Sequence, residues 1–284
     1  MRDDHSISKA VLITGCSTGI GRTTAERLAS RGHTVYATAR RLESIADLAA
    51  KGCKTLACDV TDDASMVAAV RAVEAAEGAV GALVNNAGYG QDGAVEEVPM
   101  DAVRRQFETN VFGLLRMTQL ALPGMRRQRW GRIVNVSSMG GKLVFPGGGI
   151  YHATKWAVEA LSDALRYEVR PFGVYVSVIE PGAIRTQFGE TSVGAMNATS
   201  DETSRYTAFN EGVAKRVRAT YASGMMAVGP EPVARAIERA LTARRPRSRY
   251  PVTAGARMIM AIRRVMPDQV WDAFMRTQFP PPNP

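Results

Sequence analysis

The stretch Ala10-Val11-Leu12-Ile13-Thr14-Gly15-Cys16-Ser17-Thr18-Gly19-Ile20-Gly21 decides the fold. It opens with an apolar run rich in β-branched side chains, which is typical of a buried parallel strand. From Ile20 the apolar residues recur at helical spacing, and Gly32 is a suitable stop, so the pattern predicts a helix. Residues 34–39 predict a second strand. This order of elements is a strand, a glycine-rich turn, a helix and a second strand. In such an arrangement the helix N-terminus and backbone N–H groups can bind a pyrophosphate.

A second feature is the pair Tyr151 and Lys155, which lies thirteen positions after Ser138. Residues four apart share one face of a helix, so the ammonium can lie beside the phenol. A neighbouring cation favours phenolate and lowers the phenol pKa toward the range useful for acid or base catalysis. Any amphipathic helix can carry the same pair, so its meaning depends on the rest of the sequence.

The glycine spacing, at Gly15, Gly19 and Gly21, resembles that of the short-chain dehydrogenase/reductase family. A purely structural turn is the alternative, but further family-like motifs follow in order, and the resemblance covers roughly residues 8 to 190. These motifs are Cys58-Asp59-Val60, Asn85-Asn86-Ala87-Gly88, Thr109-Asn110-Val111-Phe112-Gly113, Ser137-Ser138, Tyr151 with Lys155, and Pro181-Gly182. Val35-Tyr36-Ala37-Thr38-Ala39-Arg40 and the residues from Asn85 to Gly90 are most similar to the branch with 17β-hydroxysteroid and retinol dehydrogenases.

Length and composition are consistent with one α/β domain spanning residues 1–284, with 45% hydrophobic and 22% charged residues. Alternating strands and helices predict a Rossmann-like, doubly wound parallel sheet with helices on both faces. The first residues are too polar for a signal peptide, and no apolar run is long enough to span a bilayer. Cys16, Cys53 and Cys58 lack metal-ligand spacing, so we expect reduced cysteines, no metal and a cytoplasmic location.

The net charge of +9 raises the alternative of a nucleic-acid or membrane-surface binding protein with the same fold. The basic residues are scattered, apart from two clusters at residues 126–129 and 244–249. Neither cluster belongs to a nucleic-acid reading motif, so solvated surface cations are the favoured interpretation and no nucleic-acid partner is expected.

Cofactor choice is expected at the end of the second strand, where an acidic residue would accept hydrogen bonds from the ribose hydroxyls of NAD(H). Ala39 stands there instead, followed by Arg40, while Arg22 follows the last loop glycine. Two guanidinium groups suit a 2′-phosphate through charge-assisted hydrogen bonds. The sequence therefore favours NADP(H) over NAD(H), although each arginine alone could be an ordinary surface cation.

The family resemblance implies further cofactor contacts. Asp59 would receive the adenine amino group, Pro181-Gly182 would let the backbone approach the nicotinamide, Ile184 would meet the carboxamide and Thr186 the phosphates. A tight turn is the alternative reading of the asparagines and glycines after the fourth strand. The full expected set is Gly15, Ser17, Thr18, Gly19, Ile20, Gly21, Arg22, Arg40, Asp59, Val60, Asn85, Ala87, Gly88, Lys155, Pro181, Gly182, Ile184 and Thr186.

The chemistry follows from the charge that develops on a carbonyl oxygen when its carbon receives a hydride. Tyr151 is expected to protonate that oxygen, and Ser138 to donate a second hydrogen bond to it. Lys155 would hold the nicotinamide ribose and stabilise tyrosinate, and Asn110, as in similar enzymes, would place a water beside Lys155. In alcohol oxidation Tyr151 becomes the base. A dinucleotide sensor without catalysis should lack these residues, and this chain keeps them all.

Residues 186–230 lose strand periodicity, and Gly189 to Ser204 is rich in Gly, Ser, Thr and Asn, which predicts a mobile loop that closes over substrate. The resemblance to steroid and retinol dehydrogenases implies a lipophilic alcohol or ketone. Adaptable apolar side chains fit this expectation, although each could equally be ordinary core. The candidates are Tyr89, Met139, Phe145, Phe188 and Met196.

Residues 251–284 form an extension in which arginines alternate with methionines, and two short amphipathic helices are predicted, at 256–266 and 270–275. Packing over the substrate cleft or against another subunit is the favoured fate, and contact with a membrane surface is the alternative. The segments 110–122 and 151–167 resemble helices that form dimer interfaces in related enzymes, which implies a homodimer or homotetramer.

Overall fold

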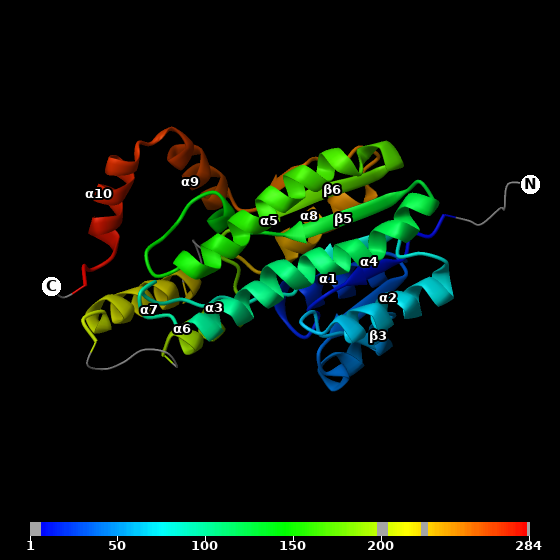
Figure 1. Cartoon of the computed structure of the whole chain (residues 1–284), viewed down its shortest axis with the longest axis horizontal. Helices are drawn as coiled ribbons and strands as arrows, with labels where there is room; N and C mark the ends of the chain where they lie inside the picture. Colours follow the sequence, from blue (N-terminus) through cyan, green and yellow to red (C-terminus); the bar gives the residue numbers. More distant parts are fainter. Residues whose placement is uncertain (1–6, 198–203, 223–226, 283–284) are drawn as a thin grey trace, which may run out of the picture.

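The computed structural model describes residues 7–197, 204–222 and 227–282. Its centre is a parallel sheet in the order β3-β2-β1-β4-β5-β6-β7, so the predicted Rossmann-like fold is confirmed (Figure 1). The strands are β1 Val11–Ile13, β2 Val35–Ala39, β3 Lys54–Ala57, β4 Ala82–Asn85, β5 Gly131–Val136, β6 Val174–Glu180 and β7 Arg249–Pro251. The strands predicted from residues 10–14 and 34–39 correspond to β1 and β2, and no pattern indicated the short β7.

Alternate residues of the strands face opposite sides of the sheet, as the two-residue period requires. Val11 and Ile13 of β1 belong to one buried apolar cluster, and Leu12 belongs to the other. The first cluster packs against α1 Gly19–Ser30, the 3₁₀ segment Leu42–Lys51 and α8 Glu231–Thr242. The second packs against α2 Asp63–Glu77, α4 Gly113–Arg127 and α5 Gly149–Glu168. Helices therefore cover both faces, as predicted.

The strand order reverses next to β1, because β2 lies on one side of it and β4 on the other. A crevice at the carboxyl ends of the strands is expected at such a switch point. The chain leaves β1 through Gly15, whose φ of +73° lies in the left-handed region. The segments that the sequence assigns to cofactor binding follow the ends of β1 to β6, including Arg40 after β2 and Asp59 after β3.

The prediction of a loop from Gly189 to Ser204 is wrong in the part that the structure describes, and residues 198–203 and 223–226 lie outside the described residues. α6 Phe188–Asn197 and α7 Thr207–Ala222 occupy this region. Val193 and Met196 are buried against Val213, so packing outweighs the weak helix propensity of the Gly, Ser and Thr residues. Movement of these helices over substrate stays a prediction.

The two helices predicted in the extension are confirmed as α9 Ala254–Val265 and α10 Asp268–Gln278. They arch away from the sheet at the end of the molecule where α6 and α7 lie (Figure 1). Leu143, Trp271 and Met275 form the buried centre of their contact with the body. The Trp271 indole Nε1 also donates to the Val144 carbonyl at 3.3 Å.

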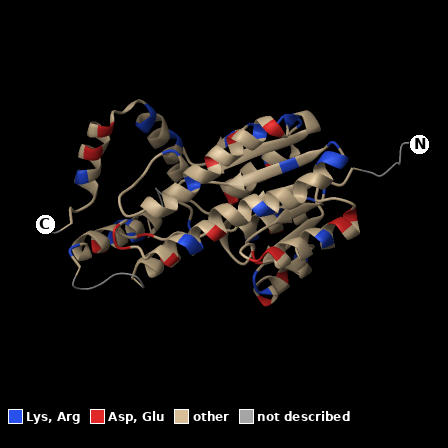
Figure 2. Cartoon of the chain, viewed as in Figure 1, with Lys and Arg blue, Asp and Glu red and all other residues tan. Residues whose placement is uncertain are grey.

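The remaining helical segments are α3 Met100–Phe107, a π-helical turn Glu108–Phe112 and the 3₁₀ turns Met139–Gly141 and Arg170–Phe172. Positive and negative side chains are distributed over the molecule rather than gathered in one field (Figure 2). Within the described residues, no helix has the length and apolar character needed to cross a bilayer.

Candidate active site

The carboxyl end of β5 and the first turns of α5 bring three predicted catalytic residues together. The Ser138 hydroxyl hydrogen-bonds with the Tyr151 phenol. It also accepts from the Gly140 N–H at 3.0 Å, which fixes the serine at the start of a 3₁₀ turn. Lys155 Nζ lies 5.7 Å from the Tyr151 ring centroid and donates to the Val136 carbonyl at 2.9 Å. A hydroxyl, a phenol and an amine therefore converge at one strand end.

The direction of the Tyr151 pKa differs from the sequence-based expectation. Burial raises the pKa of the phenol, and the hydrogen bond from Ser138 opposes this only in part. Burial also lowers the pKa of Lys155 to about 8, and the carboxylate of Glu159 opposes that shift. Burial therefore favours the uncharged form of both side chains, because a charged form is costly away from water. Such a phenol is a proton donor rather than a resting phenolate.

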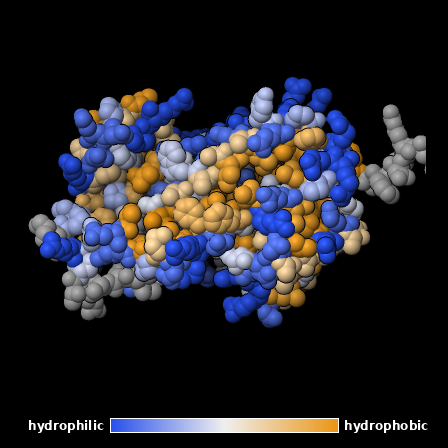
Figure 3. Space-filling model, viewed as in Figure 1, coloured by the Kyte–Doolittle hydropathy of each residue, from blue (hydrophilic) through white to orange (hydrophobic). Residues whose placement is uncertain are grey.

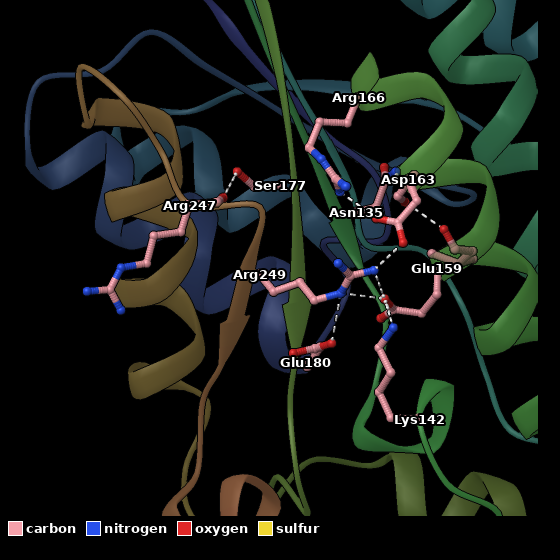
Figure 4. Close-up of polar contacts among 11 residues, drawn as sticks. Asn135, Lys142, Glu159, Asp163, Arg166, Ser177, Glu180, Arg247 and Arg249 are labelled. Carbon is pink, nitrogen blue, oxygen red and sulfur yellow. Dashed lines mark hydrogen bonds and ion pairs between the residues drawn. The ribbon is translucent and has the colours of Figure 1, made fainter. Parts of the chain in front are cut away.

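Glu159 is a residue of the site that sequence reasoning missed. It lies one helical turn beyond Lys155 and is 3% exposed. Its Oε2 pairs with Lys142 at 2.8 Å and with Arg249 at 3.0 Å, and Arg249 also reaches Glu180 at 3.4 Å (Figure 4). Its i+4 spacing from Lys155 could have indicated that Glu159 lies beside the site. Its basic partners come from β7 and the loop after β5, which the spacing does not reveal.

Asn110 reaches the same site from the π-helical turn Glu108–Phe112. Its Nδ2 donates to the Tyr89 carbonyl at 2.9 Å and to the Thr154 hydroxyl at 3.1 Å. Its Oδ1 accepts from the Tyr89 N–H at 3.1 Å. A Cβ on Gly88 would lie 3.0 Å from Asn110 Oδ1 and 3.7 Å from Lys155 Nζ, so the glycine keeps open the space between these two groups.

The glycine-rich loop at the N-terminus of α1 packs closely on its own backbone and on the segment after β4. Gly15 and Gly19 adopt φ values of +73° and +59°, which L side chains rarely tolerate. A Cβ on Gly15 would approach Ala87 Cα to 2.8 Å, and one on Gly21 would overlap the Gly15 carbonyl. Backbone N–H groups and a helix N-terminus bounded by glycines fit a dinucleotide. Ser17, Thr18 and Ile20 complete this loop.

The asparagines after β4 differ in role. Asn85 is 4% exposed, and its Nδ2 donates to Thr118 Oγ1 at 3.0 Å and Asn135 Oδ1 at 2.9 Å. Its side chain thus connects β4, β5 and α4, so the expected adenosine contact is left to its backbone. Asn86, which was not among the expected site residues, donates to the carbonyls of Thr14 and Gly15, both at 2.9 Å. It holds the glycine loop against β4.

Asp59 stands at the end of β3, followed by the buried Val60. Its Oδ1 accepts from the Thr61 N–H at 2.9 Å and the Thr61 hydroxyl at 2.8 Å. This Asx turn orients the carboxylate at the strand end. Asp59 therefore follows β3, and Ala87 and Gly88 follow β4, on the other side of β1.

The segment after β6 lies against the glycine loop. A Cβ on Gly19 would lie 3.0 Å from the Thr186 methyl, which places Thr186 beside the expected phosphate site. Ile184 is buried and bridges to Val228. The Pro181 carbonyl accepts from the Met139 N–H at 2.9 Å, next to Ser138. A Cβ on Gly182 would overlap the Thr253 hydroxyl, so this glycine also makes room for the start of α9.

The two arginines expected at a 2′-phosphate are in different states. Arg22 pairs with Asp47 and lies 3.4 Å from Glu26, and it donates to the Ser44 carbonyl at 3.3 Å. Arg40 is exposed just after β2, and no carboxylate pairs with it in the part of the chain that the structure describes. Asp47 comes from the 3₁₀ segment after β2. The sequence prediction considered only an acidic residue directly after the strand and therefore missed Asp47.

The five expected substrate residues occupy different places, and only some of them lie at the catalytic group. The Phe188 ring lies 5.3 Å from the Tyr151 ring, between centroids, at an interplanar angle of 59°, so α6 covers the catalytic tyrosine. Tyr89 and Met139 are half-buried beside Asn110 and Ser138. Met196 is 1% exposed in the core between α6 and α7, and this accounts for it without a substrate contact. Phe145 packs between His152 and Trp271, at 5.9 and 6.1 Å between ring centroids.

Polar residues near the catalytic phenol were not expected in an apolar pocket. Asp92 is buried and accepts from the Ser192 hydroxyl at 2.5 Å, and burial raises the pKa of its carboxyl. Asp92 and Tyr221 lie close enough to Tyr151 to raise the pKa of its phenol. The ring of Tyr221 also packs on Gly189, where a Cβ would approach it to 2.7 Å. A buried acid two residues after Gly90 was the available signal.

His152, next to Tyr151 in the sequence, has a structural role. Its Nδ1 lies 2.9 Å from the Leu143 carbonyl, and burial lowers the pKa of the imidazole. It therefore supports the loop after β5 and does not share the proton chemistry of its neighbour Tyr151.

A doubly wound sheet, a glycine loop at its switch point and a Ser, Tyr and Lys group at a strand end define a nicotinamide-dependent oxidoreductase. The sequence model described as short chain dehydrogenase matches residues 9–196, which is well over half of the chain. The chain therefore belongs to the short-chain dehydrogenase family.

Similar proteins support this assignment over nearly the whole length. The uncharacterized oxidoreductase YbbO of Escherichia coli is 34% identical over 271 residues, with 95% of each chain covered. Human 17-beta-hydroxysteroid dehydrogenase type 1 is 38% identical over 255 residues, with 86% of this chain and 77% of the human protein covered.

Solved structures agree with the fold and the cofactor class. A short-chain dehydrogenase from Streptomyces avermitilis superposes with a TM-score of 0.79 at 35% identity, covering 97% of both chains. A short-chain dehydrogenase/reductase from Burkholderia phymatum in complex with NAD gives 0.78 at 27% identity, covering 92% of this chain and 94% of that one. A serine dehydrogenase complexed with NADP+ gives 0.73 at 27% identity, covering 85% and 93%. The enzyme is thus an oxidoreductase with a nicotinamide cofactor.

Proposed function

We propose that the enzyme transfers a hydride between NADP(H) and the carbonyl or alcohol group of a lipophilic small molecule. The observation that carries this proposal is the convergence of Ser138, Tyr151 and Lys155 at the end of β5, with Phe188 covering the phenol. When bound, the cofactor supplies or accepts the hydride. The protein supplies orientation, a proton and a surrounding from which water is excluded.

Tyr151 donates the proton to the carbonyl oxygen as negative charge develops there. The raised pKa of its phenol keeps the proton in place until the oxygen becomes basic. Ser138, which hydrogen-bonds with the phenol, would donate a second hydrogen bond to the same oxygen. Lys155 would hold the nicotinamide ribose and would offset the charge on the phenolate that remains after proton transfer. Asn110 positions the turn beside Lys155 and places the water through which the amine exchanges protons.

The preference for NADP(H) rests mainly on Arg40. Arg40 is exposed at the end of β2 without a carboxylate partner among the described residues, whereas Asp47 and Glu26 already neutralise Arg22. A dianionic 2′-phosphate could bind Arg40 directly, whereas Arg22 would first have to leave its carboxylate partners. We therefore expect Arg40→Ala to weaken NADPH binding at least tenfold and NADH binding hardly at all. Equal losses for both cofactors would contradict the preference.

The lipophilic substrate class rests on Phe188 against Tyr151 and on the half-buried Met139 and Tyr89 around the site. The test follows consumption of NADPH and NADH with a panel of steroid, retinoid and short aliphatic carbonyls. The proposal expects the highest kcat/KM for a bulky apolar ketone or aldehyde with NADPH. Turnover of only small polar carbonyls would contradict the substrate class. Tight NADPH binding with no turnover of any carbonyl would favour a dinucleotide sensor.

We further propose that two copies associate through α4 and α5 and that the enzyme works in the cytoplasm. Apolar surface runs along these helices (Figure 3). Phe112, at the start of α4, is 51% exposed, and Tyr167 on α5 is 86% exposed. The buried free cysteines fit a reducing compartment. A Tyr167→Glu variant should lower the mass measured by light scattering, and an unchanged mass would contradict this interface.

A further inference from the structure

A large cavity lies under the arch of α9 and α10, apart from the catalytic group. Its volume is about 1270 Å³, above the roughly 300–1,000 Å³ of an ordinary small-molecule pocket. The wall comes from the loop after β5, the start of α5 and the inner sides of α9 and α10, and includes Val144, Trp156, Met260, Trp271 and Met275. Neither Ser138, Tyr151 nor Lys155 lines it.

Aromatic side chains separate the cavity from the catalytic phenol. His152 lies 5.7 Å from Tyr151, and Phe145 lies 5.9 Å from His152 and 6.1 Å from Trp271, between ring centroids. Leu143, which reaches the cavity wall, is only 1% exposed. A ligand in the cavity would therefore contact the loop that carries Met139 and Phe145 without touching the reacting carbonyl.

The charges on the rim have one dominant sign. Arg257, Arg264 and Arg276 line the cavity, and none pairs with a carboxylate in the described parts of the chain. By contrast, the lining residue Arg263 pairs with Asp268 and lies 5.4 Å from the Trp271 ring centroid. Of the acidic lining residues, Glu180 faces Arg249 at 3.4 Å, which leaves Asp272. An excess of free guanidinium groups beside apolar walls complements an anion with an apolar body.

We propose that this cavity binds a single molecule of a long-chain carboxylate. Its apolar chain would lie along the wall formed by tryptophans and methionines, and its carboxylate would bind the arginines that have no carboxylate partner among the described residues. Methionines and tryptophans accept flexible apolar chains, and Arg suits carboxylates through paired hydrogen bonds. The volume has room for a chain longer than most small substrates. This inference does not rest on the proposed reductase activity, because binding in the cavity needs no group of the catalytic site.

The tryptophans of the chain provide an internal readout. Of the three, Trp156 and Trp271 line the cavity, whereas Trp130 packs under Arg132 at 4.9 Å from its guanidinium carbon. A brominated long-chain fatty acid, used below its micelle concentration, should quench the emission of the whole protein. Trp130→Phe should retain the quenching, and Trp156→Phe combined with Trp271→Phe should abolish it. Equilibrium dialysis of the same fatty acid measures affinity independently of emission.

The charge requirement has a matched control. Replacing Arg257, Arg264 and Arg276 by Gln should weaken binding about tenfold or more, because the charge-assisted hydrogen bonds to the carboxylate are lost. The triple variant Arg71→Gln, Arg104→Gln and Arg235→Gln removes the same charge from exposed positions outside the cavity and should bind as the parent does. The brominated alcohol of equal length should bind at least about tenfold more weakly than the acid.

Three results would overturn the proposal. Equal affinity for the acid and the alcohol would show that the arginines do not recognise the carboxylate. Binding only to anionic vesicles, lost in the same arginine variant, would show a membrane-facing surface instead. A mass that doubles with protein concentration, with quenching abolished in the dimer, would show that a second copy fills the cavity.

Discussion

The catalytic edge, made of the carboxyl ends of the strands with the starts of α1 and α5, contrasts with the C-terminal extension from Pro251 onward. At the catalytic edge backbone meets backbone, and a Cβ on Gly15 would approach Ala87 Cα to 2.8 Å. In the extension Gly255 would meet nothing within 4 Å. The first region has almost no tolerance for added atoms, whereas the second is held by side-chain packing around Trp271. Chemistry should therefore depend on single residues in the first region only.

The largest expected effect tests whether chemistry is confined to the catalytic edge. Tyr151→Phe should lower kcat for carbonyl reduction by about a hundred- to ten-thousand-fold, because the proton donor is lost. NADPH affinity and thermal stability should stay close to those of the parent. Tyr167→Phe, on the same helix but 86% exposed, is the matched control and should leave kcat unchanged. A Tyr151→Phe enzyme with a normal kcat would remove the assigned proton donor.

The second effect compares one glycine from each region. Gly21→Ala should weaken nucleotide binding at least tenfold and destabilise the fold by about 1–3 kcal/mol, because its Cβ would overlap the Gly15 carbonyl. Gly255→Ala, in the first turn of α9, should be neutral or stabilising by up to about 1 kcal/mol. Titration calorimetry and urea unfolding measure both quantities. Similar behaviour of the two variants would erase the contrast between the regions.

The third effect concerns Glu180, which ends β6 on the border between the two regions. Burial and the neighbouring Glu159 raise its pKa to about 7, although the positive charges of Lys142 and Arg249 lower it in part. A carboxyl with a raised folded pKa favours folding while protonated, so this contribution is lost as pH rises from its ordinary 4.5 through 7.

Between pH 5 and pH 8, the loss should be on the order of 1–3 kcal/mol in the parent and much smaller in Glu180→Gln. Urea unfolding at both pH values measures the difference. Asp272→Asn, an exposed acid of the same cavity wall, should keep the pH dependence of the parent. Parallel stability curves for parent and Glu180→Gln would show that this carboxyl does not titrate in that range.

The smallest expected effect concerns the pH profile. Lys155 has a pKa of about 8, which Glu159 helps to keep from falling further. Because the ammonium form is lost as pH rises, reductase activity that needs it should fall above pH 8. Glu159→Gln should move this fall to lower pH and reduce kcat/KM several-fold near pH 8. Asp163→Asn removes another partner of Arg249 and should leave the midpoint in place.

Sequence predicted the catalytic edge better than the extension for a physical reason. Glycine spacing and the order of strand-end residues reflect backbone requirements, which leave exact positions such as Gly15, Ser138 and Tyr151 in the chain. The short strand β7 and the helix α6 depend on tertiary pairing and packing instead. Val193 and Met196 become helical because they reach Val213, and no local pattern encodes that contact.

Electrostatic details were the least predictable. The spacing of Tyr151 and Lys155 indicated a lowered phenol pKa, but burial dominates and raises it. Asn85 and Asn86 are identical in type and adjacent, yet one side chain joins the strands and the other holds the glycine loop. Arg22 and Asp47 are twenty-five positions apart, so their pairing could not be read from the end of β2.

The most direct test of the central claim follows deuterium from NADPH labelled at the transferring ring carbon into the product of a lipophilic ketone. The account predicts one deuterium on the carbinol carbon with the parent enzyme, and no labelled alcohol within the same time with Tyr151→Phe. Alcohol formed without the label, or formed equally fast by the variant, would contradict hydride transfer to a carbonyl that Tyr151 protonates.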